Sequence, residues 1–127
     1  MLGGIAINSV YLLDNDEAVI NSIEKTVLWQ ENGFDIIGSN TDFDQAVQEI
    51  MALRPMLVIY GWQIGGIALM RKLRAVGMSC EFITISYSWS TETMRDFFHS
   101  GGFEFILRPI NFQIMETALK NLNDKYF

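Results

Sequence analysis

Three neighbouring residues of the chain, Asp14-Asn15-Asp16, are the first whose types suggest chemistry. Carboxylate and amide oxygens are the ligands that hard cations such as Mg²⁺ take, usually together with phosphate oxygens. The same residue types also favour turns and helix N-caps without any ligand. The run therefore supports two interpretations, a cation-binding pocket or a plain turn and cap, and its surroundings must decide between them.

The elements around this run alternate between short β-type segments and helical patterns, which predicts one α/β domain with a parallel sheet and helices on both faces. The expected strands are residues 6–13, 34–37, 56–60, 81–86 and 103–107, with 56–60 in the centre. We expect residues 61–66 to form a loop.

Apolar residues at helical spacing predict five helices between and after these strands. Their inward positions are Val19, Ile23 and Val27, then Phe43, Val47 and Ile50, then Ile67, Met70 and Leu73, then Met94, Phe97 and Phe98, and finally Met115, Leu119 and Leu122. Asn32-Gly33 is expected to end the first helix, and Asp42 to cap the second. Arg71, Lys72 and Arg74 should face water.

Ligand sites of doubly wound sheets lie outside the carboxyl ends of the strands. That edge would gather Asp14, Asn15 and Asp16 with Gly61, Ser86 and Arg108-Pro109. Trp62 and Trp89 fall on segments close to it, where they could wall a small cavity. We see no nucleophile, base and orienting group converging there, so we do not expect an enzyme.

Composition excludes several other classes of function. The 127 residues suit one domain, 1–127, and carry a formal charge of −6, the wrong sign for direct binding to nucleic acid. A lone Cys80 and a lone His99 are too few for a Cys/His metal site. No apolar run is long enough to cross a membrane and no signal peptide is recognisable, so we expect a cytoplasmic protein.

The chain resembles the receiver domain of two-component response regulators, especially the subtype fused to an arabinose-regulator-type DNA-binding domain. Residues 14–61 follow that pattern without a gap, and residues 82–110 follow it again. The matching positions include Trp29, Gly33-Phe34, Gly38, Arg54-Pro55, Ser86, Gly101, Phe103, Phe105 and Arg108-Pro109. The resemblance implies a flavodoxin-like sheet of strand order 2-1-3-4-5.

In that family a Mg²⁺ ion supports transfer of a phosphoryl group to an aspartate at the end of the third strand. The matching position here is Gly61, and no Asp or Glu occurs between Glu49 and Glu81. Asn15 replaces one acid of the family's pair, Asp16 stands where the subtype usually has glutamate, and Arg108 replaces a lysine. We therefore expect no phosphoacceptor and no bound Mg²⁺, with Asp14 at most a weak ligand, and we expect Arg108 to pair with Asp14.

Ser86 and Phe105 match the residues that couple phosphorylation to the face formed by the fourth helix, fifth strand and fifth helix. They could equally be a local hydrogen bond and a core aromatic. Two functions follow. One is an atypical receiver that acts through protein contacts, either as a homodimer or against a fused DNA-binding output domain. The alternative is a regulatory module whose small-molecule ligand occupies the space beside Gly61, between Trp62 and Trp89.

Overall fold

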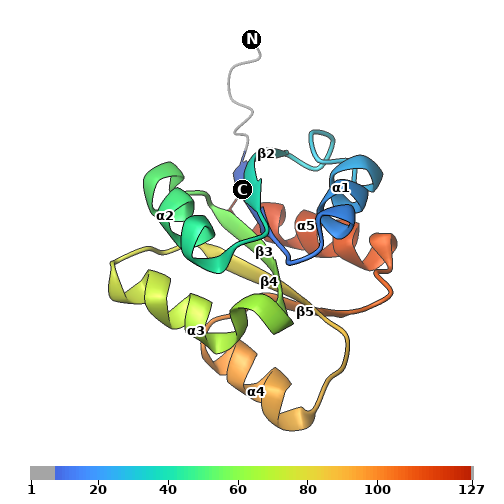
Figure 1. Cartoon of the computed structure of the whole chain (residues 1–127). Coiled ribbons are helices and arrows are strands. Elements are labelled where there is room, and N and C mark those ends of the chain that lie inside the picture. The colour runs from blue at the N-terminus through green and yellow to red at the C-terminus, as the bar shows by residue number, and fades with distance from the viewer. Residues whose placement is uncertain (1–7, 127) are drawn as a thin grey trace.

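A computed structural model describes residues 8–126 and contains a five-stranded parallel sheet of order β2-β1-β3-β4-β5 (Figure 1). This is the predicted doubly wound topology. The elements in chain order are β1 Asn8–Leu13, α1 Glu17–Thr26, β2 Phe34–Asn40, α2 Phe43–Leu53, β3 Leu57–Gly61, α3 Trp62–Ala75, β4 Glu81–Ser86, α4 Thr91–His99, β5 Glu104–Leu107 and α5 Phe112–Tyr126. Residues 6 and 7 of the first predicted strand lie outside the described residues.

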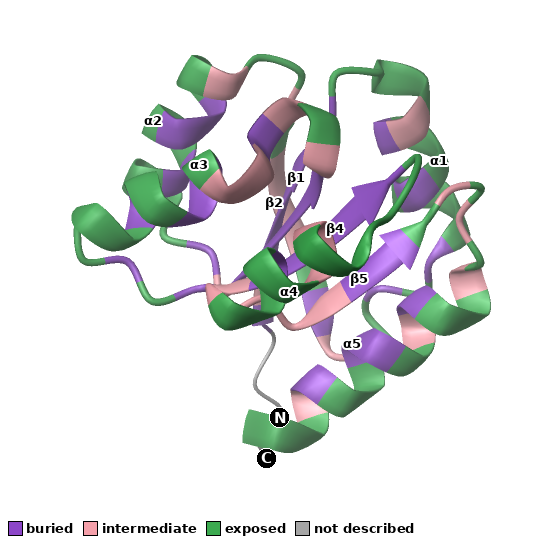
Figure 2. Cartoon of the chain, turned by 90° about the horizontal axis from the view of Figure 1, so that it is seen from below, coloured by how far each residue is buried: buried purple, intermediate pink, exposed green. Residues whose placement is uncertain are grey.

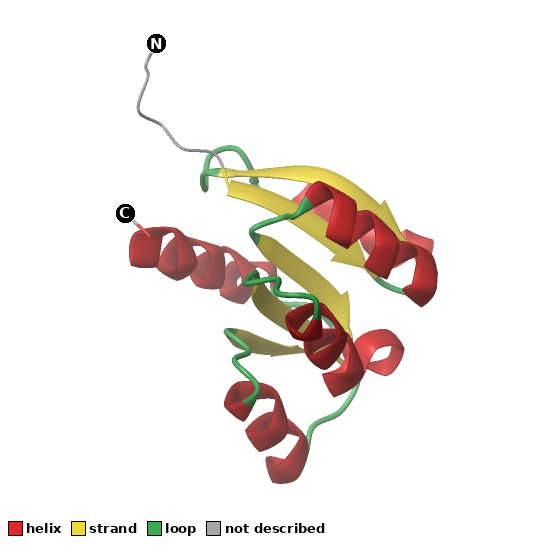
Figure 3. Cartoon of the chain, turned by 90° about the vertical axis from the view of Figure 1, so that its left-hand side faces the viewer, coloured by secondary structure: helices red, strands yellow, loops and turns green. Residues whose placement is uncertain are grey.

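The helices cover the two faces of the sheet, α1 and α5 on one and α2, α3 and α4 on the other (Figure 3). Alternate strand residues supply the two cores, because successive side chains of a strand point to opposite faces. In β3, Leu57 and Ile59 join the α1–α5 core, whereas Val58 and Tyr60 join the other. Every residue of β3 is buried, as expected for the central strand.

The first helix ends earlier than the sequence pattern predicted. It stops at Thr26, because Val27 adopts an extended conformation, and residues 28–33 form turns before β2. Val27 and Trp29 are both buried, and the Trp29 indole donates to the Ile23 carbonyl (3.3 Å). The tryptophan thus packs over the end of α1. The expectation that Asn32-Gly33 would end this helix was wrong.

The second strand also differs from its prediction. Instead of a short buried strand over 34–37, β2 is an edge strand that runs to Asn40 and is buried only at Phe34. Asp42 caps α2 as predicted, with its carboxylate accepting from the Gln45 backbone N–H (2.9 Å).

The expected loop over 61–66 is wrong. Gly61 is the last residue of β3, and α3 begins directly at Trp62 and is interrupted at Gly66 (φ 53°, ψ −150°). This backbone conformation is accessible essentially only to glycine. Gly65 is also required, because a Cβ atom there would lie 2.6 Å from the Tyr60 ring. The glycines therefore permit a broken helix that begins at Trp62, whereas the sequence pattern had suggested a loop over 61–66 before the helix that carries Ile67, Met70 and Leu73.

Most of the predicted inward positions of the later helices hold, but Ile67 is only half-buried and belongs to neither core, and Met94 is partly buried against the core. Met70, Leu73, Met115, Leu119 and Leu122 are buried. In α4, Phe97 is fully buried but Phe98 is 41% exposed, so only one of the two phenylalanines belongs to the core. Arg71, Lys72 and Arg74 are exposed as expected. None of the helices within 8–126 is long and apolar enough to cross a membrane.

Phe97 and Phe98 provide a matched test of this packing. Phe97→Ala should lower the free energy of unfolding by about 3–5 kcal/mol, because it empties a fully buried site. Phe98→Ala should cost about 1 kcal/mol or less. Urea denaturation followed by far-UV circular dichroism measures both, and equal losses would contradict the burial described here.

Candidate functional site

The carboxyl ends of the strands bring Asp14, at the end of β1, against Arg108, at the end of β5. The Arg108 Nη2 donates to Asp14 Oδ2 in an ion pair whose side chains are only 8% and 4% exposed. The predicted Asp14–Arg108 pair is therefore confirmed. Removing either partner of such a pair is costly, because it leaves the other charge buried and uncompensated.

The other two residues of the acidic run have separate local partners. Asp16 caps α1, with its carboxylate accepting from the Ala18 N–H (2.9 Å), and its own N–H donates to the second Asp14 oxygen (3.0 Å). The Asn15 amide oxygen accepts from Gln63 Nε2 (2.6 Å), which ties the β1–α1 turn to the start of α3. Turn and cap roles thus account for both Asn15 and Asp16.

These contacts do not suit the Mg²⁺ ion that the resemblance implies. One oxygen of Asp14 accepts from Arg108 and the other from the Asp16 backbone, while an arginine occupies the side of the pocket where a cation would bind. Mg²⁺ requires near-octahedral oxygen ligands and commonly one or two free carboxylates. Within residues 8–126, no group of three or more His, Cys, Asp or Glu side chains is arranged to hold a metal.

Gly61 lies where these side chains converge. A Cβ atom built on it would lie 2.6 Å from Asp14 Oδ2, 2.7 Å from Gln63 Nε2 and 3.0 Å from Arg108 Nη2. Two of these separations are shorter than any real Cβ contact and the third is at the limit, so the space beside Gly61 is already filled by its neighbours. The cavity predicted between Trp62 and Trp89 at this position is therefore wrong.

The two tryptophans lie elsewhere. Trp62 starts α3 and packs against the rings of Phe97 and Phe105, with centroids 6.0 and 6.2 Å apart. Trp89 is 58% exposed in the β4–α4 loop. There it lines a separate apolar hollow of about 320 Å³ together with Met94, Phe105 and Leu107.

Ser86 and Phe105 have the simpler of their two predicted roles in this structure. The Ser86 hydroxyl donates to the Ser88 carbonyl (2.5 Å), a local bond within the β4–α4 loop. Phe105 is 8% exposed and its ring lies 5.8 Å from that of Phe97, in the aromatic core. Both side chains are therefore buried in this structure.

Two residues of the site were missed by sequence reasoning. Gln63 belongs to the segment that was expected to be a loop. Its position two residues after Gly61 was the one feature of the sequence that could have placed it at the site. Tyr87 directly follows Ser86, and its ring lies over the Arg108 guanidinium at 4.5 Å, an arrangement that favours a cation. Arg108 Nε is buried and has no hydrogen-bond partner among the described residues.

Other potentially reactive groups lie away from this edge or are inert. Tyr60 points to the opposite face from Gly61, its hydroxyl donates to the Gly66 carbonyl (2.8 Å), and burial raises the pKa of its hydroxyl above the usual range. Burial likewise raises the pKa of the Cys80 thiol to about 11, which keeps it protonated at neutral pH. His99 is exposed in the last turn of α4.

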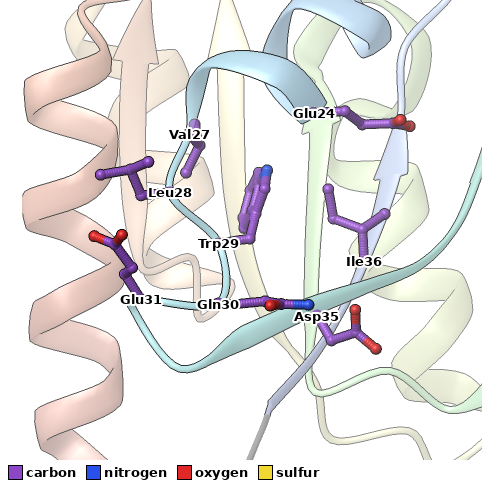
Figure 4. A pocket seen from close by; sticks show the side chains of 8 residues that line it. All are labelled: Glu24, Val27, Leu28, Trp29, Gln30, Glu31, Asp35 and Ile36. Carbon is purple, nitrogen blue, oxygen red and sulfur yellow. The ribbon is translucent and has the colours of Figure 1, made fainter.

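A hollow of about 460 Å³ lies away from the site, at the turn between α1 and the start of β2 (Figure 4). The indole of Trp29 stands in its middle, and Glu24, Glu31 and Asp35 contribute carboxylates around it. Because β2 begins at Phe34, this hollow lies at the amino end of a strand, away from the edge that carries Asp14 and Arg108.

Comparison with known proteins agrees with this architecture. No family model matches the chain. It is 25% identical over 112 residues, 86% of its length, to the probable C4-dicarboxylate response regulator DctR of Priestia megaterium, of which it covers 49%. It is 23% identical over 89% of its length to the uncharacterized transcriptional regulatory protein YesN of Bacillus subtilis, of which it covers 32%. The chain thus spans between a third and a half of these relatives.

Solved structures share the fold over almost the whole chain. The receiver (REC) domain of AraT, a response regulator from Geobacillus stearothermophilus, superposes with a TM-score of 0.84 at 15% identity, covering 94% of this chain and 95% of that one. The signal receiver domain of the putative response regulator NarL from Mycobacterium tuberculosis gives 0.81 at 14% identity, covering 94% and 98%. The chain therefore has the flavodoxin-like receiver fold. The curated relatives that it resembles are named as a response regulator and a transcriptional regulatory protein.

The ion pair can be tested through stability. Asp14→Ala should lower the free energy of unfolding by about 3–5 kcal/mol, because it leaves the Arg108 charge buried without a partner. The double variant Asp14→Ala, Arg108→Met should lose less than Asp14→Ala alone, because no uncompensated charge remains. Asp16→Asn is the matched control and should change little, since asparagine also caps helices. Urea unfolding measures the free energy of unfolding of all three variants. If Asp14→Ala lowers it no more than Asp16→Asn does, the stabilising role of the ion pair is contradicted.

Proposed function

We propose that this domain is an atypical receiver that signals through protein contacts without aspartyl phosphorylation. The observation that carries the proposal is the environment of Gly61. The residue has no carboxylate to attack phosphorus, and the nearest carboxylate, Asp14, is paired with Arg108. A nucleophile held in an ion pair with a buried arginine is a poor phosphoryl acceptor, and no cation site lies beside it to neutralise the transferred charge.

The expected lack of phosphorylation can be measured directly. Incubation of the chain with acetyl phosphate and Mg²⁺ should give no stable, stoichiometric gain of one phosphoryl group by intact-mass spectrometry. A receiver domain with aspartate at the position of Gly61 serves as the positive control for the reagent. A full phosphoryl gain on this chain would overturn the proposal.

The α4–β5–α5 face is the surface we propose for the contacts (Figure 2). Leu107 on the edge strand β5 is 42% exposed and lines the apolar hollow together with Trp89, and Ile114 on α5 is 49% exposed. Exposed apolar groups around a hollow are typical of protein interaction sites. The relatives are named as regulators and are longer than this chain, which supports a cytoplasmic regulator in which this domain pairs with a second copy and controls a fused DNA-binding domain.

Self-association tests this assignment. The chain should form a dimer in a concentration-dependent manner by analytical ultracentrifugation. Leu107→Glu should weaken it by about tenfold or more, because it buries a charge in the interface. Met51→Glu is the matched control, since Met51 is similarly exposed (41%) but lies on α2, on another part of the surface. A chain that stays monomeric throughout, or variants that dimerise equally, would contradict the proposed face.

A further inference from the structure

A further pocket, distinct from the two hollows already described, opens beside the Arg108 partner of the Asp14–Arg108 pair. It has a volume of about 350 Å³ and lies between α1, the residue that follows β4, and the segment from β5 into α5. Val19, Ile110 and Phe112 give it apolar walls, and the Tyr87 ring stands at its edge. The volume falls within the range of small-molecule sites and corresponds to about a dozen water molecules at about 30 Å³ each.

The polar end of this pocket is the Arg108 guanidinium. Its side chain is more than nine-tenths buried, Asp14 occupies Nη2, and Nε is buried without a partner among the described residues. A buried donor left unpaired is unfavourable, and natural structures satisfy nearly all such groups. The arginine therefore retains hydrogen-bonding capacity that no described residue uses.

The charge pattern of the lining selects the kind of ligand. Arg108 is the only charged residue among the described residues that line the pocket, and none of them carries a carboxylate. The Ser22 hydroxyl is the second polar group of the lining. Asp14 already compensates the Arg108 charge, so what the pocket offers is unused guanidinium N–H capacity at one end of an apolar cavity. This suits a carboxylate oxygen carried on an apolar body, and suits poorly an inorganic anion, which would leave the walls unused.

We propose that this pocket binds a small organic carboxylate. The carboxylate accepts from the Arg108 guanidinium and from Ser22, and the apolar body packs on Val19, Ile110 and Phe112. The bound ligand also holds Tyr87 against the guanidinium and so fixes the start of the β4–α4 loop. This goes beyond the proposed protein contacts, because it supplies a non-covalent effector site next to the proposed interaction face.

The test is a titration of the whole chain by ¹H–¹⁵N NMR with phenylacetate and, separately, hexanoate as probes. Binding should shift the Arg108 Nε–H resonance and the amides of Ser22, Tyr87 and Ile110 in a saturable manner at millimolar concentrations. Phenylacetamide, which has the same shape without the charge, should bind about tenfold or more weakly, since the charge-assisted hydrogen bond is lost.

Two variants distinguish this pocket from general surface binding. Val19→Trp fills the cavity from the partly exposed face of α1 and should weaken phenylacetate binding by about tenfold or more. Met51→Trp adds the same side chain at an exposed position of α2, away from both the pocket and the proposed interaction face, and should leave binding unchanged. No saturable shift with either carboxylate, equal affinity for phenylacetamide or inorganic phosphate, or full binding by Val19→Trp would overturn the proposal. None of these results bears on the acetyl phosphate experiment, so the two proposals fail independently.

Discussion

The arrangement of the C-terminal edge depends on one buried ion pair between strands that are not neighbours in the sheet. Asp14 follows β1 and Arg108 follows β5, so their contact spans the ends of β3 and β4 that lie between them. The pair determines what else fits there. Gly61 leaves room for both partners, because a Cβ atom there would lie 2.6 Å from Asp14 Oδ2 and 3.0 Å from Arg108 Nη2. The exposed Tyr87 ring packs on the guanidinium.

A second constraint lies on the other side of the sheet, where aromatic rings fix the beginning of α3 and the inner surface of α4. Trp62 contacts Tyr60, Phe97 and Phe105, and the break at Gly66 lets the helix leave that cluster in a new direction. Phe105 is thereby surrounded by rings on the inner side of β5, while Leu107, two residues later, is exposed at the outer edge. Aromatic packing sets the shape of the α4–β5–α5 face in this structure.

Periodicity and single residue types predicted the burial of β3 and the Asp42 cap, and both are confirmed. The family resemblance implied the sheet order and led us to expect the Asp14–Arg108 pair, and both are present. The sequence could not predict features set by tertiary packing. Trp29 ends α1 by packing over it. The three glycines around Trp62 resemble a loop in the sequence, although α3 begins there. The missing side chain at Gly61 suggested an open space, but the reach of Asp14, Gln63 and Arg108 into it is not visible in a linear pattern.

The crowding around Gly61 also bears on how such a domain can change over generations. An aspartate introduced at this position alone would meet the Asp14 carboxylate and the Gln63 amide at less than contact distance. A carboxylate could be accommodated at position 61 only if the neighbouring side chains changed with it. Substitutions among touching residues are strongly non-additive, so the intermediate steps carry a loss of stability. The geometry thus couples the gain of any carboxylate at position 61 to changes in Asp14, Gln63 and Arg108, and selection acting on single replacements would tend to keep glycine there.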